Sequence, residues 1–149
     1  MILLVEDNTD DVVFMKRALS NSGIRQQMRV VSDGETAIDW LGGAGEYADR
    51  NRFPLPSLVF LDLKMPGKSG LDVLEWIRSQ ERLRTLLVLI LTTSREDRDV
   101  DQAYRLGANS FLVKPGNLTG LNDLMDRVKR YWLENPQLVV GGEQMGVSS

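Results

Sequence analysis

Four short apolar runs in this sequence each end at polar side chains that could take part in chemistry. The side chains concerned are Glu6, Asp7, Asp62, Thr92 and Lys114. Each has an ordinary explanation when taken alone, because Asp favours turns, acids favour helix starts and most lysines are solvated. Converging carboxylates, however, repel one another and cost free energy unless a cation offsets their charge. The set as a whole therefore indicates a site.

Two kinds of cation can balance these carboxylates. The sequence contains no histidine and no cysteine, so a metal ion would have oxygen ligands only, which favours Mg²⁺, Mn²⁺ or Ca²⁺. Lys114 adds a fixed ammonium charge. An anion drawn to a metal and a lysine is best explained as a phosphoryl group, whose transfer needs positioning and charge neutralisation. Asp62 can accept that group as an aspartyl-phosphate, with Thr92 as a hydrogen-bond donor.

The elements that must position these residues alternate between strand and helix five times. Apolar runs predict strands at 2–5, 28–31, 58–61, 86–91 and 111–113, and helical spacing predicts helices at 10–20, 35–41, from Ser69 onward, 96–106 and 119–134. Such alternation produces right-handed βαβ units and a parallel sheet with helices on both faces. Ligands bind beyond the carboxyl ends of the strands in such sheets, which is where the five polar side chains fall.

Local signals refine these elements. Ser69 suits the cap of the third helix, whose inward stripe is predicted to be Leu71, Leu74 and Ile77. The segment Gly42–Pro56 is rich in glycine, proline and charge, so it is predicted to be an extended loop.

Composition excludes several classes of protein. The 149 residues are 42% hydrophobic and 26% charged, which is typical of one globular domain with a single core. The net charge of −3 gives no support to nucleic-acid binding. The lack of histidine and cysteine excludes Ser-His-Asp catalysis, zinc thiolate sites and disulfides. No run approaches the roughly 20 apolar residues of a membrane span, so we expect a cytoplasmic protein without membrane contact.

Four segments carry a resemblance to a known family. LLVEDN, LVFLDLKMPGKSG, LILTTS and GANSFLVKP resemble, in order and spacing, the signature segments of bacterial response-regulator receiver domains, the CheY-like proteins of two-component systems. The resemblance implies an α/β, flavodoxin-like (βα)5 fold, a doubly wound five-stranded parallel sheet of order 2-1-3-4-5. It also implies a receiver domain over residues 1–135. The tail over 136–149 contains glycines and serines without periodicity and is predicted to be flexible. Such a protein is a phosphoacceptor signalling module and not an enzyme, although it catalyses its own phosphorylation and dephosphorylation.

The resemblance assigns roles to the residues around the phosphoacceptor. Asp62 would accept the phosphoryl group, and Lys114 would contact it. Asp7 would bind Mg²⁺ directly and Glu6 through water, while the backbone carbonyl of Lys64 would add a ligand. Glu6 stands where many receivers carry Asp, and its longer arm still suits a contact through water.

Further roles concern the response to phosphorylation. Thr92 resembles the switch hydroxyl, and Phe111 resembles the aromatic ring that changes rotamer, although Phe111 is explained equally well as a core residue. Lys64 and Ser94 would tune the access of water to the phosphoaspartate. Lys114-Pro115 resembles the cis peptide of the family. Gly116 occupies a position at which many receivers carry an aromatic residue.

The partners follow from the same resemblance. The extended segment and the ending VKRYWLENP resemble those of single-domain receivers associated with bacterial phytochrome histidine kinases. A histidine kinase would therefore donate the phosphoryl group, and output would go through protein binding and not through DNA.

The last helix has two interpretations. Its apolar stripe comprises Leu121, Leu124, Met125, Val128 and Trp132. Tyr131 and Leu133 lie off that stripe, and Leu138-Val139-Val140 follow. These residues predict a homodimer through Tyr131, Trp132, Leu133 and the extension beyond them. The alternative is a helix end that folds back on its own domain.

Two other functions stay open for the site. One is a Mg²⁺-dependent phosphohydrolase with an Asp nucleophile, but Lys64 stands where a second acid is expected. The other is a degenerate receiver that serves only as a binding scaffold.

Overall fold

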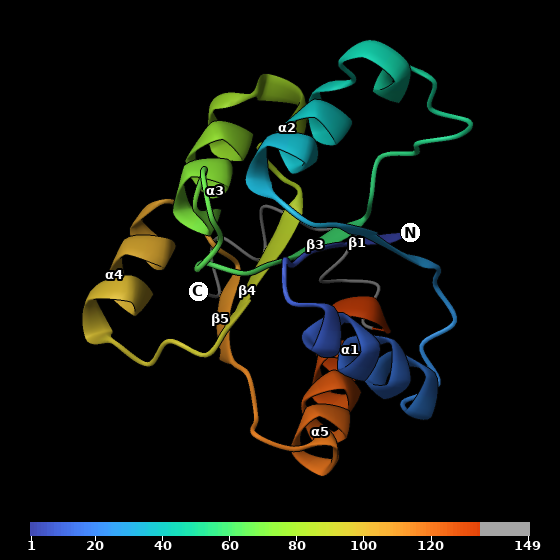
Figure 1. Cartoon of the computed structure of the whole chain (residues 1–149), viewed down its shortest axis with the longest axis vertical. Helices are drawn as coiled ribbons and strands as arrows, with labels where there is room; N and C mark the ends of the chain where they lie inside the picture. Colours follow the sequence, from blue (N-terminus) through green and yellow to red (C-terminus); the bar gives the residue numbers. More distant parts are fainter. Residues whose placement is uncertain (135–149) are drawn as a thin grey trace. The chain divides into compact units, whose positions relative to one another are not determined.

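The sheet has the topology that the sequence predicts. The structure, a computed structural model, describes residues 1–134, and its five strands are all parallel in the order β2-β1-β3-β4-β5 (Figure 1). The strands are β1 (Ile2–Val5), β2 (Met28–Val31), β3 (Leu58–Leu61), β4 (Leu87–Thr92) and β5 (Ser110–Val113). The predicted flavodoxin-like fold is confirmed.

Helices follow each strand. They are α1 (Thr9–Asn21), α2 (Gly34–Gly42), α3 (Gly70–Ser79), α4 (Asp97–Arg105) and α5 (Leu118–Val128), with short 3₁₀ turns at Gly45–Ala48 and Glu81–Leu83. The predicted bounds of α1, α2 and α4 differ from the observed ones by one residue at each end. This agreement reflects strong local signals, such as Gly43, which ends α2 in the left-handed conformation at φ 72°.

The chain divides into two compact units. The first contains Met1–Val12 and Gln26–Lys114, and the second contains Val13–Arg25 and the chain from Pro115 onward. The whole sheet, α2, α3 and α4 belong to the first unit, and α5 belongs to the second.

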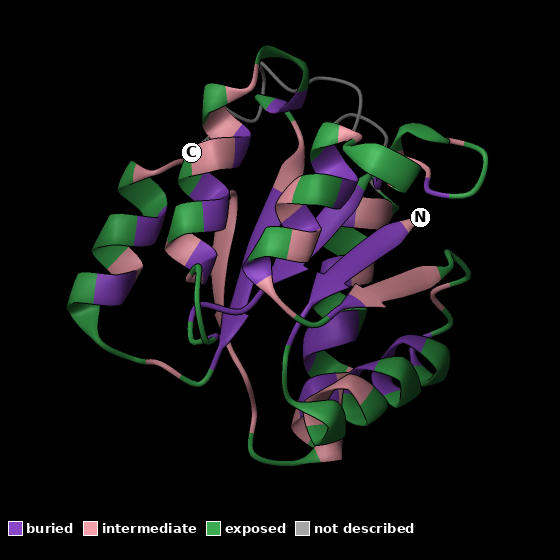
Figure 2. Ribbon diagram, turned by 45° about the horizontal axis from the view of Figure 1, so that its top comes forward, coloured by how far each residue is buried: buried purple, intermediate pink, exposed green. Residues whose placement is uncertain are grey.

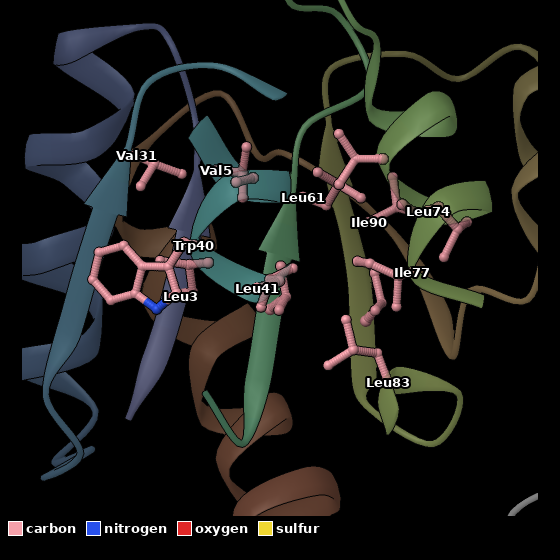
Figure 3. Packing of buried hydrophobic residues seen from close by; sticks show 14 of the residues in the cluster. Leu3, Val5, Val31, Trp40, Leu41, Leu61, Leu74, Ile77, Leu83 and Ile90 are labelled. Atoms are coloured by element: carbon pink, nitrogen blue, oxygen red, sulfur yellow. The ribbon is translucent and has the colours of Figure 1, made fainter. Parts of the chain in front are cut away.

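One face of the sheet forms the main core of the first unit. Side chains of β1, β3 and β4 pack there against α2, α3 and Ala103 of α4 (Figure 3). The labelled members include Leu3, Leu61 and Ile90 from the strands and Trp40, Leu74 and Ile77 from the helices. In α3, Leu74 and Ile77 are buried and the half-buried Leu71 packs against the core, so the predicted inward stripe is confirmed, and Val73 is buried in addition.

The central strands are the most deeply buried part of the sheet. All residues of β1 and β3 are buried, as are those of β4 from Val88 onward, whereas β5 and most of β2 are half-buried (Figure 2). The predicted two-sided burial of the fourth strand is therefore confirmed for Val88–Leu91. Because every strand is parallel, these buried runs all end at one edge of the sheet.

The extended segment after α2 is an ordered structure of its own. Trp40, Tyr47 and Phe53 form three mutual ring contacts with centroids 4.7–5.5 Å apart. The guanidinium of Arg50 donates hydrogen bonds to the carbonyls of Trp40, Leu41 and Phe53. The segment predicted as loop thus closes on an aromatic cluster and includes the turn Gly45–Ala48.

The last helix changes its winding before it ends. A π-helical segment, Lys129–Leu133, continues α5 directly. The predicted stripe is buried throughout, including Trp132, whereas Tyr131 is 51% exposed. Leu138-Val139-Val140 and the predicted tail 136–149 lie outside the described residues.

Two further findings concern the chain between residues 1 and 134. The predicted cis peptide at Lys114-Pro115 was wrong, because no peptide bond in this part of the chain is cis. No helix over the same residues is both long and apolar enough to span a membrane.

Candidate phosphoacceptor site

Three carboxylates meet at the carboxyl ends of β1 and β3. Oxygens of Glu6, Asp7 and Asp62 all lie within 4.8 Å of one another. Glu6 is 2% exposed and Asp62 is 6% exposed, whereas Asp7 is exposed. The register explains the meeting, because Val5 pairs with Leu61 and the residues that follow them leave the sheet side by side. The predicted acidic cluster is confirmed as a geometric fact.

Lys114 supplies the cation from the end of β5. Its ammonium donates to Glu6 Oε1 at 2.5 Å and to Asp11 Oδ2 at 2.8 Å, and it lies 3.4 Å from Asp62 Oδ2. The lysine is held in place by its own backbone, since the Lys114 N–H donates to the carbonyl of Thr92 at 2.7 Å. One ammonium therefore serves three carboxylates, and Asp62 is the most distant of them.

The charges of the site oppose one another strongly. Burial, with a smaller contribution from the neighbouring Asp62, raises the pKa of Glu6 to about 7 against the lowering effect of the Lys114 ammonium. Burial lowers the pKa of Lys114, but its hydrogen bonds to Asp11 and Glu6 and the charge of Asp62 outweigh burial, so the net shift is upward. The lysine thus stays charged while the cluster keeps an excess of negative charge.

The loop after β3 approaches the helix that follows it very closely. A Cβ atom on Gly70 would lie 2.1 Å from the carbonyl oxygen of Asp62, so only glycine fits at the start of α3. Ser69 caps α3 with a capping box that it shares with Asp72, which confirms the predicted cap. The Lys64 N–H donates to Asp62 Oδ1 at 3.3 Å and orients the carboxylate.

The carboxylates border an open cavity of about 540 Å³. Its lining includes Glu6, Asp7, Asp62, Lys64, Thr93 and Lys114. The cluster offers carboxylate oxygens, and one of its three acids, Asp7, is exposed to solvent. Such a set of ligands suits a hard divalent cation that keeps several water ligands. The residues therefore fit the predicted Mg²⁺ or Mn²⁺, with Glu6, Asp7 and Asp62 as the side chains able to hold it.

The two threonines at the end of β4 lie differently. Thr92 is fully buried, and its hydroxyl oxygen accepts a hydrogen bond from the Ser94 N–H at 3.4 Å. Thr93, not Thr92, lines the cavity. The structure thus places Thr92 beside the site, while its role as a moving switch stays a prediction.

Phe111 lies on β5, the edge strand next to β4. Its side chain is half-buried against the core cluster, and its N–H donates to the Tyr104 hydroxyl of α4 at 3.0 Å. This position is compatible with both interpretations of Phe111, as core residue and as switch.

Two carboxylates escaped the sequence analysis. Asp11, in the first turn of α1, is the second-nearest partner of Lys114. Asp99, on α4, is 6% exposed, accepts the Ser94 hydroxyl and lies 3.5 Å from the Lys64 ammonium. Both look like solvated helix acids in the sequence. The only local signal for Asp11 is its position three residues after the helix-capping Asn8.

Comparison with known proteins shows the family of the chain. The family model described as the response regulator receiver domain matches residues 2–129. The chain therefore belongs to the response regulator receiver domain family, and the predicted family is confirmed.

Two known relatives match most of the chain. It is 38% identical over 136 residues to the probable methanogenesis regulatory protein FilR2 of Methanothrix harundinacea, covering 89% of this chain and 83% of that protein. It is 36% identical over 138 residues to the response regulator Rcp1 of Synechocystis, covering 93% and 92%.

Solved structures of relatives have the same fold. The Mn²⁺-bound form of Rcp1 superposes with a TM-score of 0.80 at 36% identity, covering 90% of this chain and 94% of that one. The phosphorylated cyanobacterial phytochrome response regulator RcpA superposes with a TM-score of 0.82 at 35% identity, covering 89% and 93%. The predicted resemblance to phytochrome response regulators is confirmed at this level.

Proposed function

We propose that this receiver accepts a phosphoryl group on Asp62 from a partner histidine kinase, in a metal-dependent step, and signals through a conformational change that alters protein binding. The observation that carries the proposal is the meeting of Asp62 with Lys114, at 3.4 Å, inside the cluster of Glu6, Asp7 and Asp62. A buried acid beside one ammonium and two further acids is costly unless the site serves an incoming cation and anion together.

The transfer is a displacement at phosphorus. An oxygen of the Asp62 carboxylate attacks the phosphoryl group of a phospho-histidine, the new P–O bond forms as the P–N bond breaks, and the imidazole leaves with that electron pair. Lys114 neutralises charge on the phosphoryl oxygens, for which it must leave part of its present contact with Glu6 and Asp11.

The metal would be held by Asp7 and Asp62, by Glu6 through water and by the backbone carbonyl of Lys64. When bound, Mg²⁺ supplies charge neutralisation for donor and acceptor oxygens. Asp7 is the exposed member of the cluster and gives access from solvent, while the buried Glu6 sets the charge of the inner wall.

The readout would begin at the end of β4. The new phosphoryl group draws the hydroxyl of Thr92, which now accepts the Ser94 N–H, and the movement makes room for Phe111. The two residues lie on neighbouring strands, β4 and β5. The altered surface would then change binding to a partner.

The partners are proposed from the relatives. A phytochrome histidine kinase is the proposed donor because RcpA is named as a phytochrome response regulator and is 35% identical to this chain. A cytoplasmic location suits that donor. We also propose a homodimer through Tyr131, Trp132 and Leu133, in which the exposed Tyr131 would make the first contact because Trp132 is buried.

The test is the intact mass of the protein after incubation with acetyl phosphate and Mg²⁺. A gain of one phosphoryl group is expected, and it should be lost in Asp62→Asn and on chelation of the metal. Asp101→Asn, a carboxylate on α4 that is paired with Arg105, is the matched control and should react normally. No gain in the wild type, with its fold and Mg²⁺ binding intact, would contradict the proposal and favour a binding scaffold, whereas turnover of a small phosphate ester would favour a phosphohydrolase.

A further inference from the structure

A second buried carboxylate lies next to the proposed site and has no part in the mechanism above. Asp99 on α4 is 6% exposed, although α4 is otherwise a polar helix with Ala103 as its only other buried residue. The Ser94 hydroxyl donates to Asp99 Oδ2 at 2.5 Å, and the Lys64 ammonium lies 3.5 Å from the same oxygen. A buried carboxylate is tolerated only when it is paired in this way.

The two partners of Asp99 occupy equivalent places in the chain, each two residues after a residue of the proposed site. Lys64 comes two residues after Asp62, lines the cavity and donates its N–H to the Asp62 carboxylate. Ser94 comes two residues after Thr92 and donates its N–H to the Thr92 hydroxyl oxygen. One oxygen of Asp99 therefore joins the loop of the phosphoacceptor to the loop of the proposed switch.

The charge of Asp99 is secure in this arrangement. The hydrogen bond from Ser94 lowers the pKa of Asp99 more than burial raises it, and the charge of Lys64 lowers it further. The carboxylate is therefore ionised at neutral pH and attracts the same groups that a phosphoryl group on Asp62 would attract.

We propose that Asp99 is a positioning residue that holds the side chains of Lys64 and Ser94 away from Asp62 and gives them up when Asp62 carries a phosphoryl group. The inference rests on the proposed function. A phosphoryl group adds roughly 1.5 to 2 negative charges and three acceptor oxygens, so it competes with Asp99 for one ammonium and one hydroxyl.

The release would be transmitted by α4. A buried carboxylate that loses its donors carries a desolvation cost, and this cost favours a new position of the helix. At the other end of α4, the Tyr104 hydroxyl accepts the Phe111 N–H from β5 at 3.0 Å. Asp99 and Tyr104 thus connect the proposed site with the edge of the sheet through a single helix.

The experiment measures the affinity of beryllofluoride, a mimic of the phosphoryl group, in the presence of Mg²⁺. Asp99→Asn removes the charge that competes for Lys64 and Ser94, so we expect the dissociation constant to fall about threefold to tenfold. In a Lys64→Met, Ser94→Ala background, Asp99→Asn should have little further effect. Asp101→Asn is the matched control, because Asp101 pairs with Arg105 on the exposed side of α4 and should leave the affinity unchanged.

A readout on the wild type covers the case in which Asp99→Asn does not fold. The carboxyl carbon resonance of Asp99 should shift when beryllofluoride binds, and that of Asp101 should not. An unchanged affinity in a folded Asp99→Asn, an equal effect in the double-variant background or an unshifted Asp99 resonance would overturn the inference alone. A wild type that binds no beryllofluoride would overturn the proposed function, and this inference with it.

Discussion

Two cations at opposite ends of the sheet show how differently a fold can surround a positive charge. Lys114 follows β5 and has three carboxylates around its ammonium. Arg78 of α3 reaches the region before β4 and β5, where its guanidinium donates only to neutral oxygens. Its acceptors are the carbonyls of Gly107, Leu83, Arg84 and Leu86 and the side chain of Asn109.

The two environments shift the pKa values of Arg78 and Lys114 in opposite directions. Burial lowers the pKa of Arg78, and within residues 1–134 no carboxylate offsets this loss of water. Around Lys114, the carboxylates outweigh burial and the pKa rises. Each nitrogen of the Arg78 guanidinium donates to at least one neutral oxygen, so the side chain ties α3 to the segments that precede β4 and β5. The single charge of Lys114 does not neutralise its three carboxylate partners, and a metal ion can balance the remaining negative charge.

The largest expected effect comes from removing the cation of the site. Lys114→Met leaves Glu6 and Asp62 buried without an ammonium, so we expect the free energy of unfolding at pH 8 to fall by about 3–5 kcal/mol. Mg²⁺ should restore much of this loss, because a divalent cation can replace the missing charge. Urea unfolding with and without Mg²⁺ measures both effects, and a loss that Mg²⁺ leaves untouched would break the comparison. The Lys114→Met variant should not be phosphorylated, whether or not Mg²⁺ restores its stability.

The second prediction concerns the structural cation. Arg78→Met leaves several carbonyls without donors, and we expect the free energy of unfolding to fall by about 3 kcal/mol. Mg²⁺ should not reverse this loss, and phosphorylation by acetyl phosphate should persist in the folded fraction. Arg78→Lys is a useful partner variant, since it keeps the charge without the planar fork and should also be destabilised. Full recovery in Mg²⁺ would show that the two ends of the sheet are not independent.

The third prediction concerns the pH dependence of stability that the buried Glu6 causes. Glu6 has a pKa of about 7 in the folded protein against 4.5 for the free group. Between pH 4.5 and pH 7 the folded state thus binds more protons than the unfolded state. The stability that Glu6 contributes is therefore fully present below pH 4.5 and is lost as the pH rises through 7. The expected loss is about 2–3 kcal/mol. Unfolding in urea at pH 5, 6, 7 and 8 measures it, and Glu6→Gln should flatten the curve relative to Glu35→Gln.

The smallest effect is expected at the edge of the site. Asp11 bonds Lys114 at 2.8 Å, but its side chain is 33% exposed. Asp11→Asn should therefore change the free energy of unfolding by less than about 1 kcal/mol. Asp11→Asn should still alter the rate of phosphorylation by a few fold, because Lys114 loses its one carboxylate partner that is not a proposed metal ligand. Asp10→Asn, the neighbouring acid, is the control, and equal rates in both variants would show that Asp11 does not position the lysine.

Much of the site was predictable because its signals are local. Each acid follows a buried apolar run, and the parallel sheet brings the ends of such runs together, so Glu6, Asp7, Asp62 and Lys114 could be placed before any coordinates. Ser69 was predictable for the same reason, since a cap depends on the first turn of its own helix. Val73 shows the limit, because it is buried although it lies off the predicted stripe of α3, and only the packed sheet decides how wide the buried face of a short helix is.

Four properties follow from the amino-acid sequence alone: the order of the polar residues at the strand ends, the absence of histidine and cysteine chemistry, the family and the candidate phosphoacceptor. The tertiary structure alone decided how the charges are shared: that Lys114 lies nearer to Glu6 and Asp11 than to Asp62, and that Asp99 is buried between Ser94 and Lys64. The reason is physical. Periodicity and capping act within one element, whereas burial and ion pairing depend on distances between elements that only the packed chain sets.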